Sequence, residues 1–453
     1  MTDTSLEAHV MPDRDQELDG LVDSAQSAID HARRLGADGS EVSASLHYGL
    51  NINVRMGEVE TLEHSRDRGM AISVYLGHSK GQASSGDLRP ESIRTCVEKA
   101  IDIARFTQAD KCNGLAPKDR LAKQFPDLDL WHPQPMDAEL TSQRALACEA
   151  AGLENPKISN SDGASASASF GLNAFANSEG FAGRREGTRY GQSCVLIAGE
   201  GESMQRDYWY DSKRAFPDLE SVEDTGHEAA RRTVQRLGAR VIPTCEVPIL
   251  FAPEVARGLI GHLVSAISGG ALYRKASFLQ DAAGQQLFPS WMRMSERPYV
   301  PRGPASTAFD AEGVATRDRE LIDNGVLTGY VLGSYSACRL GLETTGNAGG
   351  IHNLLLNPGK FSAEELIQQT GTGLLVTEVM GQGVNIITGD YSRGAGGFWI
   401  ENGEIQFPVD EVTIAGNLKD MFLGIEAVGN DVDERSNIQS GSILVGKMTV
   451  AGS

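Results

Sequence analysis

The sequence predicts an α+β protein of two or three domains. A helix and antiparallel-sheet domain at the N-terminus is expected to precede a C-terminal domain with a curved or barrel-like, mainly antiparallel sheet and buried helices. Two patterns predict this class. In the first half, segments with alternating apolar residues are flanked by segments in which apolar residues recur every three or four positions. In the second half, Asn-Gly pairs between short apolar runs indicate β-hairpins.

Residues 1–109 are predicted to form a helix, sheet and helix unit. Residues 15–35 carry apolar side chains at helical spacing, and 41–54 alternate with period two, as in a half-buried strand. Pro90 suits the first turn of a second helix, which is expected to continue to residue 106. Between the first strand and this helix, further strands are expected at 59–65, 69–76 and 81–85.

Residues 110–238 are predicted to be a second α+β segment of the N-terminal half. Prolines punctuate the stretch 110–136, which indicates a long connection between subdomains. Beyond it, the sequence predicts a helix at 138–151, strands within 157–210 and a helix at 219–237.

Residues 239–453 are predicted to form the C-terminal core domain. Asn324-Gly325 and Asn402-Gly403 each separate two short apolar runs and predict hairpins. Ser362, three residues before Glu365, predicts a capping box at the start of a helix.

A stretch near the middle of the chain, residues 247–272, predicts a buried strand that leads into a buried helix. An apolar run ends at Pro253, and Leu259 and Leu263 then continue an apolar stripe with a spacing of four residues. Gly269-Gly270 is expected to end the helix.

Composition excludes several functional classes. A net charge of −20 disfavours binding to a nucleic-acid backbone, which usually needs a basic surface. No apolar run reaches the roughly 18 residues that a membrane-spanning helix needs, and residues 1–20 are acidic without the apolar core of an export signal. The six cysteines are far apart and include no C-x-x-C pair, which favours reduced thiols and a cytoplasmic location.

Several long motifs resemble the TldD/PmbA (modulator of DNA gyrase) family, and most closely its PmbA branch, also called TldE. The motifs that carry the resemblance are VPILFAPEVARGLIGHLVSAISGGAL from 247, TGNAGG from 345, MGQGVNIITGDYSRGAGGFWIENGEIQFPV from 380 and VGND from 428. The resemblance implies a peptidase complex in which the TldD branch holds zinc through two histidines and a cysteine, with a glutamate as general base. Such a set leaves one zinc position open for water, which the carboxylate deprotonates.

Carried onto this sequence, the family's zinc-site positions fall on Arg257, Gly258, His262 and, on or near it, Ser440. A guanidinium cannot bind zinc, and glycine has no side chain that could act as the general base. The resemblance therefore implies no metal and no cofactor in this chain. It implies the non-metal partner of a zinc-bearing TldD-type homologue, with a homodimer when that homologue is absent. By the same resemblance, the complex degrades peptides and unfolded segments, matures a microcin precursor and removes an antitoxin.

The alternative reading is a metallopeptidase in its own right, with an unrecognised metal site around His262. Because His262 lies on the apolar stripe of its helix, a buried histidine hydrogen-bonded to a neighbour is also expected there. Arg257 could be a surface charge, or it could pair with a buried carboxylate or a peptide C-terminus. Only its position suggests Ser440 as a nucleophile.

A glycine-rich run at 389–397 is the candidate substrate channel. Its candidate contact residues are Asp390, Tyr391, Ser392, Arg393 and Gly394. Glycines leave the backbone open, so an extended peptide could pair with it; a tight bend before the strand that starts at Phe398 is the other interpretation.

Overall fold

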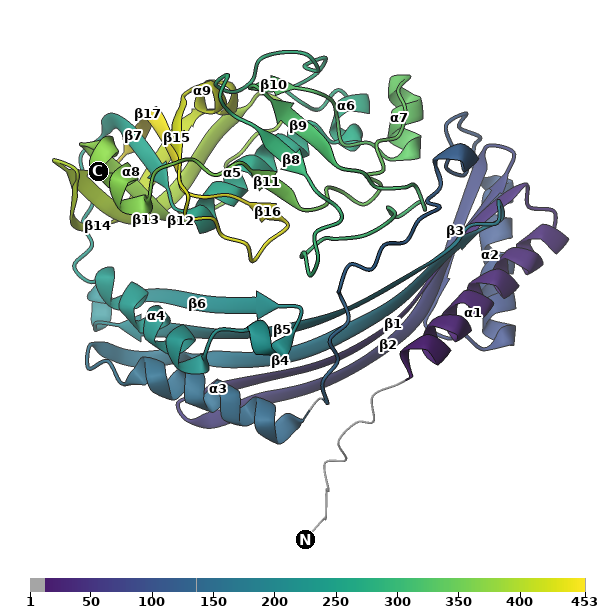
Figure 1. Ribbon diagram of the computed structural model, residues 1–453, viewed down its shortest axis with the longest axis horizontal. Coiled ribbons are helices and arrows are strands. Elements are labelled where there is room, and N and C mark those ends of the chain that lie inside the picture. The colour runs from purple at the N-terminus through teal and green to yellow at the C-terminus, as the bar shows by residue number, and fades with distance from the viewer. Residues whose placement is uncertain (1–12, 136, 453) are drawn as a thin grey trace, which may run out of the picture.

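The computed structural model describes residues 13–135 and 137–452. Figure 1 shows a long curved sheet from the N-terminal half, with helices on its outer face and the C-terminal domain over its inner face. This mixture of helices and largely antiparallel sheets confirms the predicted α+β class. The first twelve residues, where no export signal is expected, lie outside the described residues.

One six-stranded antiparallel sheet, in the order β3-β2-β1-β4-β5-β6, forms the N-terminal half. Strand β1 pairs with β4, so the segments before and after the long connection share this sheet. The separate strands predicted at 59–65 and 69–76 are wrong, because residues 65–69 stay paired with β1 and join them. The strands are β1 (Gly39–Arg55), β2 (Glu58–Leu76), β3 (Ser79–Ser85), β4 (Ile158–Asn177), β5 (Ala182–Ala198) and β6 (Gln205–Lys213).

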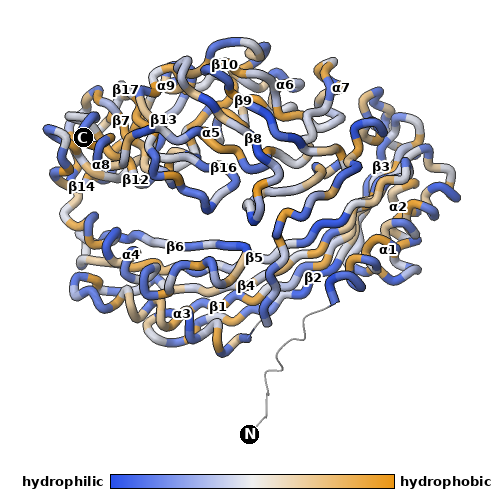
Figure 2. Tube along the Cα trace, in the orientation of Figure 1, coloured by the Kyte–Doolittle hydropathy of each residue, from blue (hydrophilic) through white to orange (hydrophobic). Residues whose placement is uncertain are grey.

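Helices cover one face of this sheet because its strands alternate. In β4, Ala164, Ala166 and Ala168 are buried while Ser165 and Ser167 between them are only partly buried. Strand β6, by contrast, is hydrophilic along most of its length (Figure 2). The helices lie close to their predicted ranges: α1 (Arg14–Arg34), α2 (Pro90–Phe106), α3 (Ala138–Leu153) and α4 (Val222–Gln235).

Two glycines allow α3 and α4 to pack closely. A Cβ atom added at Gly226 would lie 2.2 Å from the carbonyl oxygen of Cys148 and 2.9 Å from the main-chain nitrogen of Gly152. Because both atoms belong to the backbone, a larger residue at 226 would force the two helices apart.

The connection from α2 to α3, residues 107–137, is tied to the C-terminal domain by a disulfide between Cys112 and Cys338. The prediction that all six cysteines are reduced is therefore wrong for this pair. The two residues are 226 positions apart, so only the folded chain brings them together. The free cysteines are Cys96, Cys148, Cys194 and Cys245.

Five strands of the C-terminal domain close into a barrel-like ring, because β14 pairs with both β13 and β17. Among the described strands of the ring, only β7 and β12 are parallel, which confirms the predicted mainly antiparallel, barrel-like sheet. Strand β15 extends the ring at β17. These strands are β7 (Cys245–Phe251), β12 (Gly373–Met380), β13 (Asp390–Glu401), β14 (Glu404–Asn417), β15 (Ile425–Val428) and β17 (Ile443–Ala451).

A second sheet of this domain has the order β10-β9-β8-β11-β16. Its strands are β8 (Met294–Glu296), β9 (Arg319–Asp323), β10 (Val326–Leu327), β11 (Leu354–Leu356) and β16 (Ile438–Gln439). The helices of the domain are α5 (Pro253–Ala266), α6 (Gly269–Tyr273), α7 (Ser334–Leu340), α8 (Ala363–Thr370) and α9 (Leu418–Leu423). Short 3₁₀ turns elsewhere in the chain are η1 (Lys118–Arg120), η2 (Gly201–Ser203) and η3 (Phe216–Asp218).

The strand and helix predicted at 247–272 are present as β7 and α5, and Pro253 is the first residue of the helix. The predicted end of the helix is wrong. Helix α5 stops at Ala266, and Gly269 begins the separate helix α6 instead of ending α5. The buried side chains of Leu259 and Leu263 belong to the core of the C-terminal domain.

The predicted turns of this domain are confirmed. Asn324 and Gly325 have φ angles of 49° and 79°, and Asn402 and Gly403 have 54° and 76°, the left-handed pair that a tight hairpin requires. Ser362 forms the predicted capping box at the start of α8. None of the helices in the described part of the chain is both long and apolar enough to cross a membrane.

Candidate functional site

Helix α5 carries three of the four predicted zinc-site positions: Arg257, Gly258 and His262. The fourth, Ser440, directly follows β16, which packs against the same helix. An added Cβ atom at Gly258 would have no other atom within 4 Å, so this position has room for a side chain. The fold thus brings the N-terminal end of α5 close to the segment that holds Ser440.

Arg257 is occupied by contacts within the protein. Its Nη1 atom donates to the hydroxyl of Tyr210, at 3.0 Å, and lies 3.6 Å from Oδ2 of Asp433. The side chain of Asp433 is only 5% exposed. Of the roles considered for Arg257, pairing with a buried carboxylate is therefore the one that the geometry supports.

Asp433 belongs to a cluster that joins the C-terminal domain to β6. Arg435 donates to both of its carboxylate oxygens, at 2.8 and 3.1 Å, and to the main-chain oxygen of Tyr210. The guanidinium of Arg435 lies 4.1 Å from the ring centre of Trp209. Burial by itself would raise the pKa of Asp433, but the hydrogen bonds from Arg435 and the charge of Arg257 outweigh it and hold this pKa below its usual value.

Ser440 is fully buried, and its hydroxyl donates to the carbonyl oxygen of Gly441 at 2.7 Å. Its own main-chain oxygen accepts from the N–H of Asp433 at 3.1 Å. A nucleophile must reach its substrate and needs a base within hydrogen-bond distance. Ser440 has neither access nor a base among the described residues, so the arrangement gives it a structural part.

His262 is half-buried and makes no hydrogen bond with the described residues, so the expected hydrogen-bonded histidine is not found. Its ring instead meets that of Tyr391 edge to face, with the ring centres 5.9 Å apart. Burial, and then the positive charge of Arg393, lower the pKa of His262, while burial raises the pKa of Tyr391 to about 12. Both pKa shifts favour the uncharged form of the side chain.

The candidate channel residues lie on β13, where Tyr391 is buried and Asp390 and Ser392 are exposed. Arg393 donates from Nε to the last carbonyl of β12, at 2.9 Å. From Gly394 onward the strand is paired on one side with β12 and on the other with β14, so this part offers no open edge to a peptide. Residues 390–393 pair with β14 but not with β12.

The described residues do not fit a zinc ion. In this part of the chain, no group of three or more His, Cys, Asp and Glu side chains is arranged to hold a metal. At the positions implied by the resemblance, the cation of Arg257 would repel a metal ion, and Gly258 supplies neither ligand nor base.

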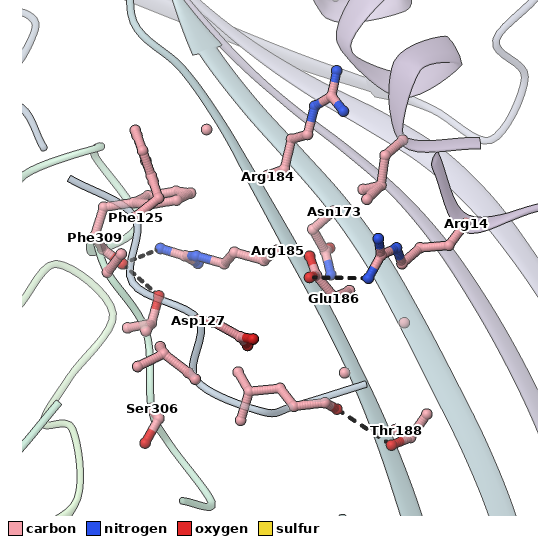
Figure 3. A pocket seen from close by; sticks show the side chains of 18 of the residues that line it. Arg14, Phe125, Asp127, Asn173, Arg184, Arg185, Glu186, Thr188, Ser306 and Phe309 are labelled. Carbon is pink, nitrogen blue, oxygen red and sulfur yellow. Dashed lines mark hydrogen bonds and ion pairs between the residues drawn. The ribbon is translucent and has the colours of Figure 1, made fainter. Parts of the chain in front are cut away.

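A cleft of about 860 Å³ lies where the connection crosses the inner face of the sheet. Figure 3 shows Arg185 reaching from β5 toward Phe309 of the C-terminal domain, with Asp127 and Glu186 beside it. Arg185 donates to the main-chain oxygens of Phe309 and Asp310, and burial lowers its pKa to about 10. Sequence reasoning missed this cleft because its walls come from segments far apart in the chain, from α1 to residues 305–309.

This architecture is that of a metallopeptidase family. Profiles described as PmbA/TldA metallopeptidase domain 1, central domain and C-terminal domain match residues 40–104, 131–237 and 244–452. The chain belongs to the PmbA/TldD family. It is 49% identical over 417 residues to the protein named metalloprotease PmbA of Escherichia coli O157:H7, covering 92% of this chain and 93% of that one. It is 47% identical over 429 residues to the metalloprotease PmbA homolog of Haemophilus influenzae, covering 94% of each chain.

Solved structures share the whole fold. A protein of Bacteroides thetaiotaomicron described as a candidate modulator of DNA gyrase has a TM-score of 0.90 and 27% identity, with 98% of this chain and 100% of that chain covered. TldE from Thermococcus kodakarensis has a TM-score of 0.83 and 22% identity, with 95% and 100% covered, a likeness of fold alone.

Proposed function

We propose that this chain is the non-metal subunit of a TldD/TldE-type metallopeptidase complex. In this proposal a metal-bearing homologue holds zinc and cleaves peptides or unfolded segments, such as a microcin precursor or an antitoxin, in the cytoplasm. The observation that carries the proposal is the state of Arg257. Its guanidinium stands at the position that the resemblance assigns to a zinc ligand. There it is paired with Asp433 of the same domain and hydrogen-bonded to Tyr210 of β6, so an ion pair occupies the position of a metal ligand.

An exposed strand supports the proposed partner. Residues 58–68 of β2 are all exposed, and β3 pairs only with residues 70–76, so among the described residues this stretch has main-chain pairing on one side only. Met56, Val59 and Leu62 expose apolar side chains on or beside it. A strand edge of this length is a ready template for another chain. It is the surface on which we place the metal-bearing homologue, or a second copy when that homologue is absent.

The side chains around His262 support contact with peptides in such a complex. Tyr391 and Arg393 flank this histidine, while Asp390 and Ser392 are exposed on the same strand. Since the backbone of β13 is paired on both sides from Gly394 onward, we expect side chains to make the contacts with a peptide along that part of the strand.

Metal content and hydrolysis test the proposal directly. The chain is purified alone and together with a metal-bearing homologue, and both samples are assayed for zinc by elemental analysis and for cleavage of an unstructured peptide. We expect metal and chelator-sensitive cleavage only in the joint sample. Stoichiometric zinc and cleavage in the lone chain would overturn the proposal and favour a metal site around His262.

A triple variant tests the positional assignment. Arg257→His, Gly258→Glu and Ser440→Cys together restore the ligands and base that the resemblance implies, and Gly258 has room for the added side chain. We expect the variant to bind about one zinc per chain. The matched control keeps Arg257 and carries only the other two substitutions; it should stay metal-free. A metal-free triple variant would show that the positions are wrongly assigned.

A further inference from the structure

The Cys112–Cys338 disulfide joins the two halves of the molecule at the end opposite their main-chain link. The chain passes from α4 to β7 at one end of the curved sheet, whereas α7 and the connection meet at the other end (Figure 1). The connection that carries Cys112 continues along the cleft, which residues 125–130 line. The disulfide and the main-chain link therefore hold the C-terminal domain over the sheet at its two opposite ends.

Polar contacts place the two cysteines beside each other without the covalent bond. Asp110 accepts from the hydroxyl of Tyr335 at 2.9 Å, from Arg339 at 3.3 Å and from the N–H of Cys112 at 3.0 Å. Tyr335 and Arg339 lie on α7, one turn or less from Cys338. These contacts are partly exposed to water and individually weak, so they can hold the two thiols close to each other without linking the segments permanently.

The two sulfurs differ in access. Cys338 is exposed, whereas Cys112 is 8% exposed. Thiol–disulfide exchange requires a thiolate to approach one sulfur in line with the bond, so access decides which sulfur is attacked. Of the other four cysteines, Cys96, Cys148 and Cys194 are buried, so neither they nor the half-buried Cys245 offers a comparably exposed sulfur.

We propose that the Cys112–Cys338 pair is a thiol–disulfide exchange site at which a low-molecular-weight thiol opens, and its disulfide closes, a covalent clasp between the connection and α7. The reducing thiolate bonds to the sulfur of Cys338, the Cys112–Cys338 bond breaks, and the electron pair leaves on Cys112, which takes a proton from water. A second thiol then attacks the mixed disulfide, releasing Cys338 as a thiol and the small disulfide. Closure runs in reverse, with oxidised glutathione as one such oxidant.

Thiol counting tests the bond itself. In the chain equilibrated with oxidised glutathione and then denatured, we expect four titratable thiols, and six after full reduction. A peptide map without reduction should contain the linked fragments with Cys112 and Cys338. Six free thiols in the oxidising buffer would overturn the proposal.

Single-cysteine variants test the order of attack. With oxidised glutathione, Cys112→Ser should gain one glutathione at Cys338 about tenfold faster than Cys338→Ser gains one at Cys112, because only the former sulfur is exposed. Cys245→Ser serves as the control and should close the clasp like the parent chain. Equal rates in the first two variants would contradict the assigned attack.

Limited proteolysis of the connection tests the consequence. Cleavage within 107–137 should be about tenfold faster in the reduced chain than in the oxidised chain, and Cys338→Ser should behave as the reduced chain in both buffers. Identical cleavage of the oxidised and reduced chains would show that the bond is not a clasp. These measurements need neither metal nor peptidase activity, so they stand apart from the proposed function.

Discussion

Replacing Asp433 by alanine tests whether the cluster around Arg257 holds the two halves of the chain together. The side chain of Asp433 is 5% exposed, and its carboxylate accepts two hydrogen bonds from Arg435, at 2.8 and 3.1 Å. Its Oδ2 atom also lies 3.6 Å from Nη1 of Arg257. The substitution removes the only carboxylate that either ion pair uses among the described residues. It therefore leaves the guanidinium groups of Arg257 and Arg435 without a carboxylate at ion-pair distance among the described residues.

The expected cost follows from the exposure of the two arginines. Breaking a fully buried ion pair by removing one partner costs about 3–5 kcal/mol. The side chain of Arg435 is 11% exposed and that of Arg257 is 26% exposed, so water can screen part of the uncompensated charge. We expect Asp433→Ala to lower the free energy of unfolding by about 3 kcal/mol, and Asp433→Asn, which keeps one acceptor, by about half as much.

The pH dependence separates this effect from a general packing defect. The pKa of Asp433 is lower in the folded chain than in the unfolded chain, so its stabilisation is complete above the unfolded pKa of about 3.9 and is lost as the pH falls through the folded pKa. The difference between the parent chain and Asp433→Asn should therefore be largest near neutral pH and shrink below about pH 4.

Urea unfolding followed by tryptophan fluorescence measures both quantities, since Trp209 lies in the cluster. Asp420→Asn, an exposed aspartate of α9, is the matched control and should change the free energy of unfolding by less than about 0.5 kcal/mol. The reasoning fails if Asp433→Ala behaves like this control. It also fails if the difference between the parent chain and Asp433→Asn is the same at all pH values.

Three further substitutions test other parts of the structure. Leu62→Lys should weaken association with the metal-bearing homologue at least about tenfold in sedimentation experiments, because a charge on the exposed strand opposes pairing. The control Leu140→Lys changes an exposed leucine on α3 and should leave the association unchanged. Arg393→Gln should raise the pKa of His262 in an NMR titration, because the positive charge that lowers it is gone; an unchanged pKa would leave burial as the sole cause. Gly226→Ala should lower the free energy of unfolding by about 1–3 kcal/mol in urea, and a neutral result would contradict the close helix contact.

Local patterns predicted most of the secondary structure. Helical spacing and Pro253 marked the start of α5, and the Asn-Gly pairs at 324 and 402 marked two hairpins, because each depends on residues adjacent in sequence. The prediction failed where residues from distant parts of the chain determine the local structure. Strand β2 runs unbroken through residues 65–69 because β1 pairs with them, and Gly269 begins a helix where a stop was predicted.

The candidate site was predictable only in part. Motif positions identified Arg257, Gly258, His262 and Ser440, but nothing in the sequence linked them to Asp433. The partner of Arg257 emerges only when α5, β6 and the segment after β15 are packed together. The sequence did not show that strands β12 and β14 flank the glycine run from Gly394 onward, because this pairing depends on the whole ring.

By itself the sequence determined the family and the α+β class, since these depend on residue identity and local periodicity. Only the tertiary structure decided that Arg257 pairs with Asp433 and donates a hydrogen bond to Tyr210 of the other half. It likewise decided that Cys112 and Cys338 meet across 226 residues, and that residues 58–68 expose a strand edge. The physical reason is the same in each case: charge pairing, disulfide formation and strand pairing depend on distances between segments far apart in the chain, and local patterns carry no information about those distances.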